Sequence, residues 1–167
     1  MSDLPTYVLE RAFAAPRELV WRAWTEEALF ARWYGPNVET IIHRQELRVG
    51  GECRVEMRWG GGSNYQKLTY HEVAAPSRLV WLHSNADADW NVAVNPKMPD
   101  WPRTLVTRVT FDQDGAQTRL RLEWAPHDAS AAEIACFAAA MDGMGMGWNA
   151  GMEILATILA ELQSEKS

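Results

Sequence analysis

Apolar residues recur every three or four positions along the C-terminal part of the chain, between Ser130 and Gln163. They are Ile134, Phe137, Met141, Met144, Trp148, Met152, Leu155, Leu159 and Leu162. This spacing is typical of one face of an α-helix with about 3.6 residues per turn. Ser130 and Glu133 also match a capping box, in which the side chain of each residue binds the backbone amide of the other. The pattern therefore predicts a long amphipathic helix over residues 130–163.

Three alternating glycines, Gly143, Gly145 and Gly147, lie in the middle of this predicted helix. In an exposed helix interior, each glycine costs about 1 kcal/mol relative to alanine. Two arrangements are consistent with these glycines. The helix either bends or meets another backbone closely there, or it breaks into two helices. We favour a single bent helix.

A short β-compatible run, residues 6–13, begins the chain and ends before Pro16. Pro16 suits the start of a helix. Thr25 is a suitable cap for a second helix, which is expected to end at Gly35-Pro36. The apolar sides of the two helices consist of Leu19, Val20, Ala23 and Trp24, and of Leu29, Phe30 and Trp33. We therefore expect one strand followed by a pair of short helices.

From residue 38 to residue 124 the pattern changes to β-type runs that are separated by glycine, proline and acidic turns. The expected strands are 38–45, 52–59, 65–73, 78–84, 104–112 and 118–124. In the strands 52–59 and 118–124, apolar and charged residues alternate, which is typical of a sheet with one apolar face. The connections are too short for the crossover helices that parallel strands need, so the sheet is expected to be antiparallel.

Together these elements predict a single α+β domain over residues 1–167. It consists of a curved seven-stranded antiparallel sheet, two short helices after the first strand and the long C-terminal helix. The sheet offers one apolar face and the helix one apolar stripe, so each is expected to cover the other. A twisted sheet does not close perfectly around one helix. The gap between them is the natural place for a ligand cavity.

The charge of the chain argues against a nucleic-acid partner, because the net charge is −6 and the Lys and Arg residues are scattered. The chain has neither an N-terminal signal pattern nor an apolar run long enough to span a membrane, which predicts a cytoplasmic protein without a membrane partner. Cys53 and Cys136 have no paired spacing, so we expect buried thiols and neither a disulfide nor a zinc site.

Catalytic residues are not evident in the sequence. The histidines His43, His71, His83 and His127 lack the spacing of metal ligands, and no metal or cofactor is expected. His71 and His83 lie on strands that should be neighbours, so they form an acid/base pair or are separate sheet residues. We favour separate residues. Asp142 is a buried acid with a perturbed pKa if it faces inward, but exposure to solvent is the favoured alternative.

The nine tryptophans either fill a large core or line a cavity for an apolar ligand. Candidate cavity residues are Met57, Trp59, Trp81, His83, Val109, Phe111, Met141, Met144, Trp148 and Met152. A long loop over residues 85–103 carries Trp90 and Trp101 and several prolines. This loop is a lid over the cavity, a dimer contact or a rigid connector.

Several short motifs resemble the START/SRPBCC superfamily, and within it the bacterial homologues of the activator of the ATPase of heat-shock protein 90. The motifs are Ala15–Trp21, Leu29–Pro36, Leu47–Gly51, Pro76–Val80, and Gly147-Trp148 with Leu155 and Leu159. They occur in the family's order over nearly the whole chain. The resemblance implies a helix-grip fold, in which a curved sheet grips the C-terminal helix around a hydrophobic cavity. The superfamily includes lipid and hormone binders, polyketide cyclases and a co-chaperone domain.

Three functions are consistent with this sequence. The first, which we favour, is binding of a small hydrophobic or aromatic ligand, without assigned catalysis, in a cavity gated by Trp90 and Trp101. The second is a chaperone-interaction module of the stress response, as the family resemblance implies. The third is a cyclase- or hydratase-type enzyme that uses His83, His71 or Asp142. A monomer and a homodimer are both consistent with the sequence.

Overall fold

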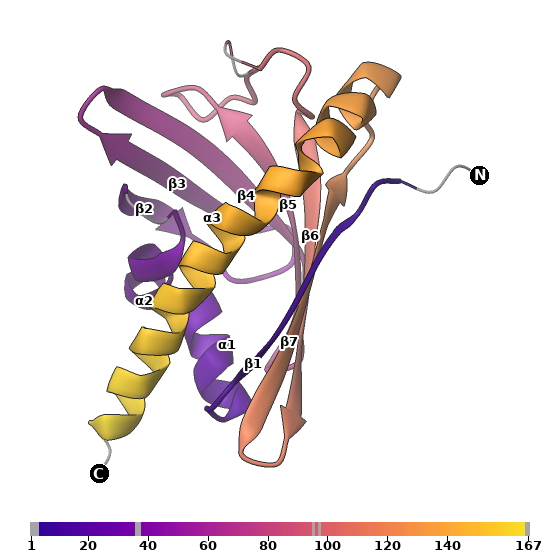
Figure 1. Ribbon diagram of the computed structural model, residues 1–167. Coiled ribbons are helices and arrows are strands. Elements are labelled where there is room, and N and C mark those ends of the chain that lie inside the picture. The colour runs from indigo at the N-terminus through magenta and orange to yellow at the C-terminus, as the bar shows by residue number, and fades with distance from the viewer. Residues whose placement is uncertain (1–3, 36–37, 95, 97, 166–167) are drawn as a thin grey trace.

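The computed structural model describes residues 4–35, 38–94, 96 and 98–165. Seven antiparallel strands form one curved sheet in the order β1-β7-β6-β5-β4-β3-β2 (Figure 1). The strands are β1 (Tyr7–Phe13), β2 (Glu39–Gln45), β3 (Glu52–Trp59), β4 (Gly62–Ala74), β5 (Arg78–Ala86), β6 (Thr104–Asp114) and β7 (Gln117–Pro126). The helices are α1 (Arg17–Thr25), α2 (Glu27–Trp33) and α3 (Ala131–Ser164). The predicted α+β fold, with its curved sheet and long C-terminal helix, is confirmed.

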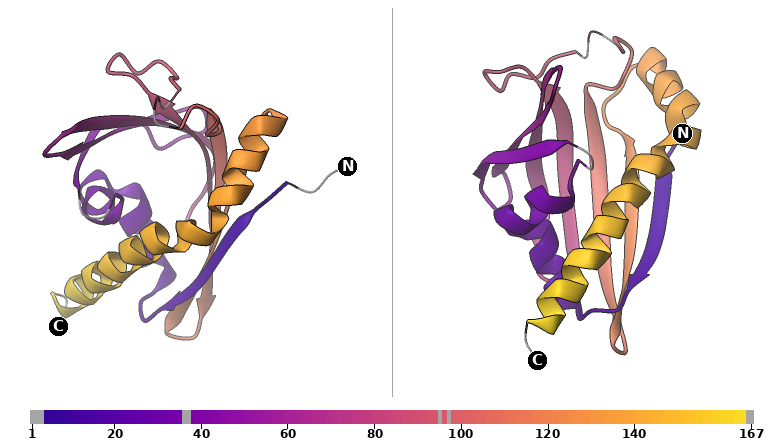
Figure 2. Two further views of the ribbon diagram at one scale, coloured as in Figure 1. Left: turned by 45° about the horizontal axis from the view of Figure 1, so that its top comes forward. Right: turned by 60° about the vertical axis from the view of Figure 1, so that its left-hand side comes forward.

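The alternation of apolar and charged residues determines which face of the sheet is covered. On β3, Cys53 and Val55 are fully buried, while Arg54 between them is partly exposed. On β7, Leu120 and Leu122 are buried and the arginines beside them are exposed. Because successive side chains point to opposite faces of a strand, one face of the sheet is mainly apolar. This is the concave face, against which all three helices lie (Figure 2).

The two short helices connect opposite edges of the sheet, since β1 and β2 are its edge strands. Thr25 does not cap the second helix as predicted. It is the last residue of α1, and its hydroxyl donates to the carbonyl of Trp21, while Glu26 precedes α2 without a side-chain cap. The helix pair is held together by Trp33, whose indole N–H donates to the carbonyl of Ala23 at 2.9 Å. Pro36, at the predicted end of the second helix, lies outside the described residues.

The C-terminal helix α3 is continuous from Ala131 to Ser164, so the predicted single helix is confirmed. Figure 2 shows that it changes direction along its length, as expected for a bent helix. The predicted capping box is present. Ser130 Oγ accepts from the amide of Glu133 at 3.2 Å, and Glu133 Oε1 accepts from the amide of Ser130 at 3.0 Å. Of the helices in the described ranges, none is long and apolar enough to cross a membrane.

The concave side holds two clusters of buried apolar residues. The large one lies under the C-terminal half of α3 and includes Trp24, Trp81 and Leu155, and the small one joins Leu105, Phe137 and Met144. Both cysteines are free thiols. Cys53 is buried as predicted, whereas Cys136 is partly exposed because it lies beside the buried face of α3 and not on it.

Candidate functional site

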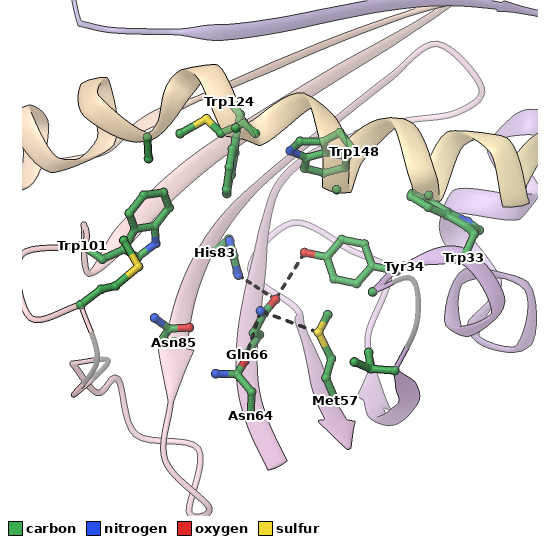
Figure 3. A pocket seen from close by; sticks show the side chains of 18 of the residues that line it. Trp33, Tyr34, Met57, Asn64, Gln66, His83, Asn85, Trp101, Trp124 and Trp148 are labelled. Atoms are coloured by element: carbon green, nitrogen blue, oxygen red, sulfur yellow. Dashed lines mark hydrogen bonds between the residues drawn. The ribbon is translucent and has the colours of Figure 1, made fainter. Parts of the chain in front are cut away.

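A cavity of about 690 Å³ lies between the concave face of the sheet and α3. Its volume is within the range of small-molecule sites. Side chains from the sheet, from α2 and from the loop after β5 surround a common space beside the helix (Figure 3). The lining residues are Trp33, Tyr34, Gly35, Val38, Met57, Trp59, Asn64, Gln66, His83, Asn85, Met98, Trp101, Trp124, Ala140, Gly143, Met144, Gly147, Trp148 and Gly151.

Four polar side chains form a patch on the sheet side of this cavity. Asn64 and Gln66 are two residues apart on β4, and His83 and Asn85 are two residues apart on β5. Residues with this spacing point to the same face of a strand. The register places Gln66 directly opposite Asn85. The four side chains therefore gather on one part of the cavity wall, which we call the polar patch.

Gln66 organises the hydrogen bonds of the polar patch. Its Nε2 donates to Asn64 Oδ1 at 3.2 Å, so its Oε1 faces His83 and lies 2.8 Å from His83 Nε2. The hydroxyl of Tyr34 donates a longer bond, at 3.5 Å, to the same oxygen. An amide oxygen only accepts hydrogen bonds, so the imidazole carries its proton on Nε2 and leaves Nδ1 as an acceptor.

His83 is uncharged at neutral pH. Its side chain is buried, with 8% of the residue exposed, and burial lowers the pKa of its imidazole to about 4 because the charged form would lose its hydration. The ring lies nearly parallel to that of Trp124, with the ring centroids 6.4 Å apart. Within the described part of the chain, the Nδ1 atom of His83 forms no hydrogen bond and is not completely enclosed by protein atoms.

Four small residues of α3 face the cavity: Ala140, Gly143, Gly147 and Gly151. Their spacing of three or four residues places them on one side of the helix. A β-carbon built on Gly143 or Gly147 would meet nothing within 4 Å, so these two glycines border open space. A β-carbon on Gly151 would lie 3.2 Å from the carbonyl oxygen of Trp33, so this glycine lets α3 approach α2 closely.

Aromatic rings form most of the remaining wall. The rings of Trp124 and Trp148 meet edge to face, with centroids 5.8 Å apart. Trp124 presents carbon atoms to the cavity, because its Nε1 is covered by protein and has no hydrogen-bond partner among the described residues. Trp59, which is substantially exposed, marks the mouth of the cavity. The wall is therefore apolar apart from the polar patch.

The long loop between β5 and β6 reaches the cavity through its second half. Trp101 packs against Trp124 and Phe137, with ring centroids 6.0 and 5.7 Å apart, and it lines the cavity together with Met98. Asn95 and Lys97, in the middle of the loop, lie outside the described residues.

Trp90, the other predicted lid residue, does not line the cavity. Its ring lies 5.5 Å from that of His43 and 5.4 Å from that of Tyr65, with the guanidinium of Arg54 over it at 5.7 Å. These partners alternate with inward-facing residues on their strands, so they belong to the outer face of the sheet. The first half of the loop is thus attached outside the sheet, and the second half inside it.

The structure brings five of the ten predicted cavity residues together at the cavity: Met57, Trp59, His83, Met144 and Trp148. The other five do not line it. Trp81, Val109, Phe111 and Met152 are almost fully buried in the large core cluster, and Met141 packs in the small one. Alternation along a strand shows which side chains point inward. It does not show which of them are covered by a neighbouring helix.

His71 and His83 do not form a pair. His83 points into the cavity, whereas His71 is exposed, because it stands at an odd number of residues from the inward-facing Gln66 and next to a β-bulge. Asp142 is exposed on α3. Among the residues that the structure describes, no Asp, Glu, Lys or Arg lines the cavity, and no group of three or more His, Cys, Asp or Glu residues has the geometry to hold a metal ion.

The sequence analysis missed the residues Tyr34, Asn64, Gln66, Asn85 and Trp124, which all line the cavity. A weak signal for the amides exists. Asn64 and Gln66 stand an even number of residues before the buried Leu68 and Tyr70 on β4, so all four side chains should point to the same face. Polar residues at inward positions are candidates for a binding site.

Solved structures of the same fold come from several bacteria. A crystal structure from Mycobacterium smegmatis is 21% identical, with 95% of this chain and 96% of that chain covered and a TM-score of 0.75. A solution structure from Arthrobacter aurescens is 20% identical, covers 96% and 90% of the two chains and has a TM-score of 0.80. A crystal structure from Nitrosomonas europaea is 23% identical, covers 96% and 98% and has a TM-score of 0.72.

Comparison with curated protein sequences finds no match. A family model, in contrast, matches residues 14–160, which extend from the end of β1 to the last turns of α3. Its description is "Activator of Hsp90 ATPase homolog 1-like protein". The match includes both helices of the N-terminal pair, six strands and the glycine stretch of α3. The chain therefore belongs to the family of activator of Hsp90 ATPase homolog 1-like proteins.

Proposed function

We propose that this protein binds a small hydrophobic or aromatic molecule in the cavity between the sheet and α3. The observation that carries the proposal is the cavity itself, with a volume of about 690 Å³ and a wall of aromatic rings, methionines and glycines. A concave, largely apolar site of this size is the usual setting for a small-molecule ligand. An apolar ligand gains free energy by leaving water, at about 25 cal/mol per Å² of surface buried.

The proposed contacts with the ligand come from the sheet and from α3. Met57 on β3, and Met144 and Trp148 on α3, provide apolar contact, while the polar patch orients the ligand. Methionine suits such a wall, because its unbranched side chain adapts to the shape of its neighbour. Trp59 is a substantially exposed residue of the wall, so an entering ligand would contact it first.

The loop between β5 and β6 is proposed to control access to the cavity. Its Trp101 and Met98 lie at the cavity wall, and Met98 is substantially exposed. Trp90 attaches the start of the loop to the outer face of the sheet. Motion of the second half alone would then open the cavity, while the first half stays in place.

Titration with the neutral fluorescent probe N-phenyl-1-naphthylamine tests the proposal. We expect saturable binding of one probe per chain. Met144→Gln places an amide of similar size in the cavity wall and should weaken binding at least about fivefold, or about 1 kcal/mol. Met146→Gln is the matched control, because Met146 is two residues away and 81% exposed to solvent. Absence of saturable binding, or equal loss in both variants, would contradict a ligand cavity.

Native mass spectrometry of the purified protein, followed by organic extraction, would then identify a ligand that co-purifies. A stoichiometric lipophilic molecule that is lost in Trp148→Ala would agree with the proposal, since Trp148 lines the cavity. A ligand that is retained in this variant would point to another site.

A second candidate function is interaction with a chaperone, which the family match favours. Addition of the protein to a purified heat-shock protein 90 would raise its ATPase rate if this function holds. An unchanged rate would argue against it. A cyclase- or hydratase-type reaction is the third candidate, and His83 is the one proposed acid/base residue that faces the cavity.

A further inference from the structure

The cavity contains no counter-charge for an ionised ligand. Its described lining residues include no Asp, Glu, Lys or Arg, and burial keeps the imidazole of His83 neutral at neutral pH by lowering its pKa to about 4. A carboxylate or ammonium group that entered would lose its hydration without gaining an ion pair. The net charge of the chain, −6, adds a further penalty for anions.

The polar patch nevertheless keeps hydrogen-bonding capacity for a neutral group. Gln66 uses its oxygen on His83, and its amide nitrogen donates to Asn64 Oδ1 and, at 3.9 Å, to Met57 Sδ. The side chain of Asn85 forms no hydrogen bond with any described residue, so it keeps an acceptor oxygen and two donor N–H groups. The free Nδ1 of His83 adds a second acceptor on the same face of β5.

The two residues that carry these free atoms are close neighbours on one face of β5, which limits the ligand group that would satisfy both. His83 and Asn85 are two residues apart on β5, about 7 Å along the strand. A hydroxyl or amide that donates to His83 Nδ1 and accepts from Asn85 Nδ2 would use both residues. A purely accepting group, such as a carboxylate, would leave His83 Nδ1 facing another acceptor.

The wall opposite the polar patch, which is formed by α3, lacks side chains at two positions. Gly143 and Gly147 expose the backbone of α3, and open space lies in front of both. They are four residues apart, about 6 Å along the helix axis, which is close to the length of a two-ring aromatic system. Trp124 and Trp148 stand edge to face beside them. A flat ring system fits a bare helix surface better than a branched or bulky one does.

We propose that the cavity selects neutral, flat ring compounds that carry a hydroxyl or amide group. His83 Nδ1 and the Asn85 amide bind that group, and the backbone at Gly143 and Gly147 contacts the ring. Fatty acids and other carboxylates are excluded because no Lys or Arg is among the described residues that line the cavity. This inference rests on the proposed function, and it names the ligand class of the same cavity.

Three naphthalene probes of nearly equal size test the inference by calorimetry at pH 7.5: 2-naphthamide, which is neutral, 2-naphthoate, which is an anion, and 2-methylnaphthalene, which has no polar group. We expect 2-naphthamide to bind at least tenfold more tightly than 2-naphthoate. Asn85→Leu should reduce the affinity for 2-naphthamide to that for 2-methylnaphthalene and leave the latter unchanged. Asn149→Leu is the control, because Asn149 is exposed on α3 and does not line the cavity.

The ring contact is tested separately with Gly147→Leu, which fills the space in front of the helix and should abolish binding of all three probes. Ala139→Leu adds a leucine on the exposed side of the same helix and should leave binding unchanged. Equal affinity for 2-naphthamide and 2-naphthoate, or an unchanged amide affinity in Asn85→Leu, would overturn the inference. Binding of N-phenyl-1-naphthylamine without binding of any naphthalene probe would also overturn it and leave the proposed function intact. Loss of every probe in the wild-type protein would overturn both.

Discussion

Two glycines on α3, Gly143 and Gly147, lower the stability of the helix but leave space for the cavity. Each glycine weakens a helix by about 1 kcal/mol relative to alanine. A side chain on either would nevertheless extend into the cavity, since a β-carbon meets no other atom within 4 Å. Residues that are unfavourable for the local structure but useful for a site are expected at functional positions.

Gly147→Ala is therefore expected to stabilise the protein by about 1 kcal/mol, because the new methyl group meets open space. Gly151→Ala provides the contrast. Its β-carbon would lie 3.2 Å from the carbonyl oxygen of Trp33, so the gain in helix propensity is offset by crowding. Urea denaturation of both variants measures the difference in the free energy of unfolding. Equal effects in the two variants would contradict the different surroundings of these glycines.

The buried imidazole of His83 predicts a loss of stability in mild acid. Its pKa is about 4 in the folded protein and 6.5 in the unfolded chain, so the unfolded chain binds a proton first as the pH falls. The stabilisation is fully present above pH 6.5 and decreases by about 3 kcal/mol as the pH approaches 4. The pKa of Glu56 is lowered to about 2 by hydrogen bonds from Arg58 and His43, so its contribution to stability is lost mainly below pH 4.5.

Urea denaturation between pH 7.5 and 5 would measure this effect in the wild-type protein and in His83→Gln, which keeps a hydrogen-bonding side chain without a titratable group. The wild-type protein should lose stability more steeply than the variant over this interval. Parallel decreases would show that other groups are responsible.

Single residues also show where the sequence analysis was limited. Met57, His83 and Trp148 were predicted at the cavity because they are apolar or titratable and face inward. Asn64 and Asn85 were missed, because an amide at an inward position has the same appearance in the sequence as an amide in a loop. Only the pairing of β4 with β5, which places Gln66 opposite Asn85, brings the polar side chains together.

At the scale of elements, α3 is held to the rest of the molecule differently at its two ends. At the N-terminal end, Glu133 completes the capping box and also accepts from the backbone amide of Arg103 at 2.7 Å, which joins the helix to the end of the long loop. Toward the C-terminal end, ion pairs connect Glu153 to Arg11 at 2.9 Å and Glu161 to Arg32 at 2.8 Å. The glycine stretch lies between these attachments.

Glu133→Ala should destabilise the protein by about 1–2 kcal/mol, because it leaves the backbone amides of Ser130 and Arg103 without their acceptors. Glu133→Gln retains one of the two acceptor oxygens and should lose less. Glu153→Ala is the comparison for an exposed ion pair, since 72% of its side chain is accessible, and should lose less than about 1 kcal/mol. Thermal unfolding of the three variants gives the ranking, and a loss in Glu153→Ala as large as that in Glu133→Ala would contradict it.

The loop after β5 is the element expected to set the rate of ligand release. Trp101 packs against Trp124 and Phe137 at the cavity wall, so Trp101→Ala should raise the dissociation rate of N-phenyl-1-naphthylamine several-fold. Trp90 packs on the outer face of the sheet, and Trp90→Ala should have a smaller effect. Stopped-flow fluorescence measures both rates. An unchanged rate in Trp101→Ala would argue against the loop as a lid.

The elements themselves were largely predictable. Alternation in strands such as β3 and β7, and the three- and four-residue spacing in α3, are strong signals because they extend over many residues. The predicted cap at Thr25 was wrong, because α1 and α2 are separated by a single residue and the Thr25 hydroxyl donates back to the carbonyl of Trp21. The sequence does not indicate so short a connection. Trp90 has a backbone φ of 66°. Because a positive φ is uncommon for a bulky residue, the position of its side chain could not be predicted from the sequence.

At the scale of the whole molecule, the cavity persists because α3 rests on two separate clusters of buried residues. Leu155 and Ile158 anchor it in the large cluster, and Phe137 anchors it in the small one. Trp124 and Tyr7 are partly buried and pack against both clusters. The helix therefore passes over the space between them as a bridge, and its bare glycine surface does not collapse onto the sheet.

A ligand that fills this space would connect the two clusters and stabilise the whole fold. At a concentration one hundred times its dissociation constant, a ligand that binds only the folded state contributes about 2.7 kcal/mol. For a chain of this length, that stabilisation corresponds to a rise in Tm of about 5–10 °C. We expect N-phenyl-1-naphthylamine to produce such a rise in the wild-type protein and in Met146→Gln, and a smaller one in Met144→Gln, whose new amide lies in the cavity wall. Calorimetric scans at several probe concentrations measure the shift. An equal rise in all three proteins would mean that the probe binds outside the cavity.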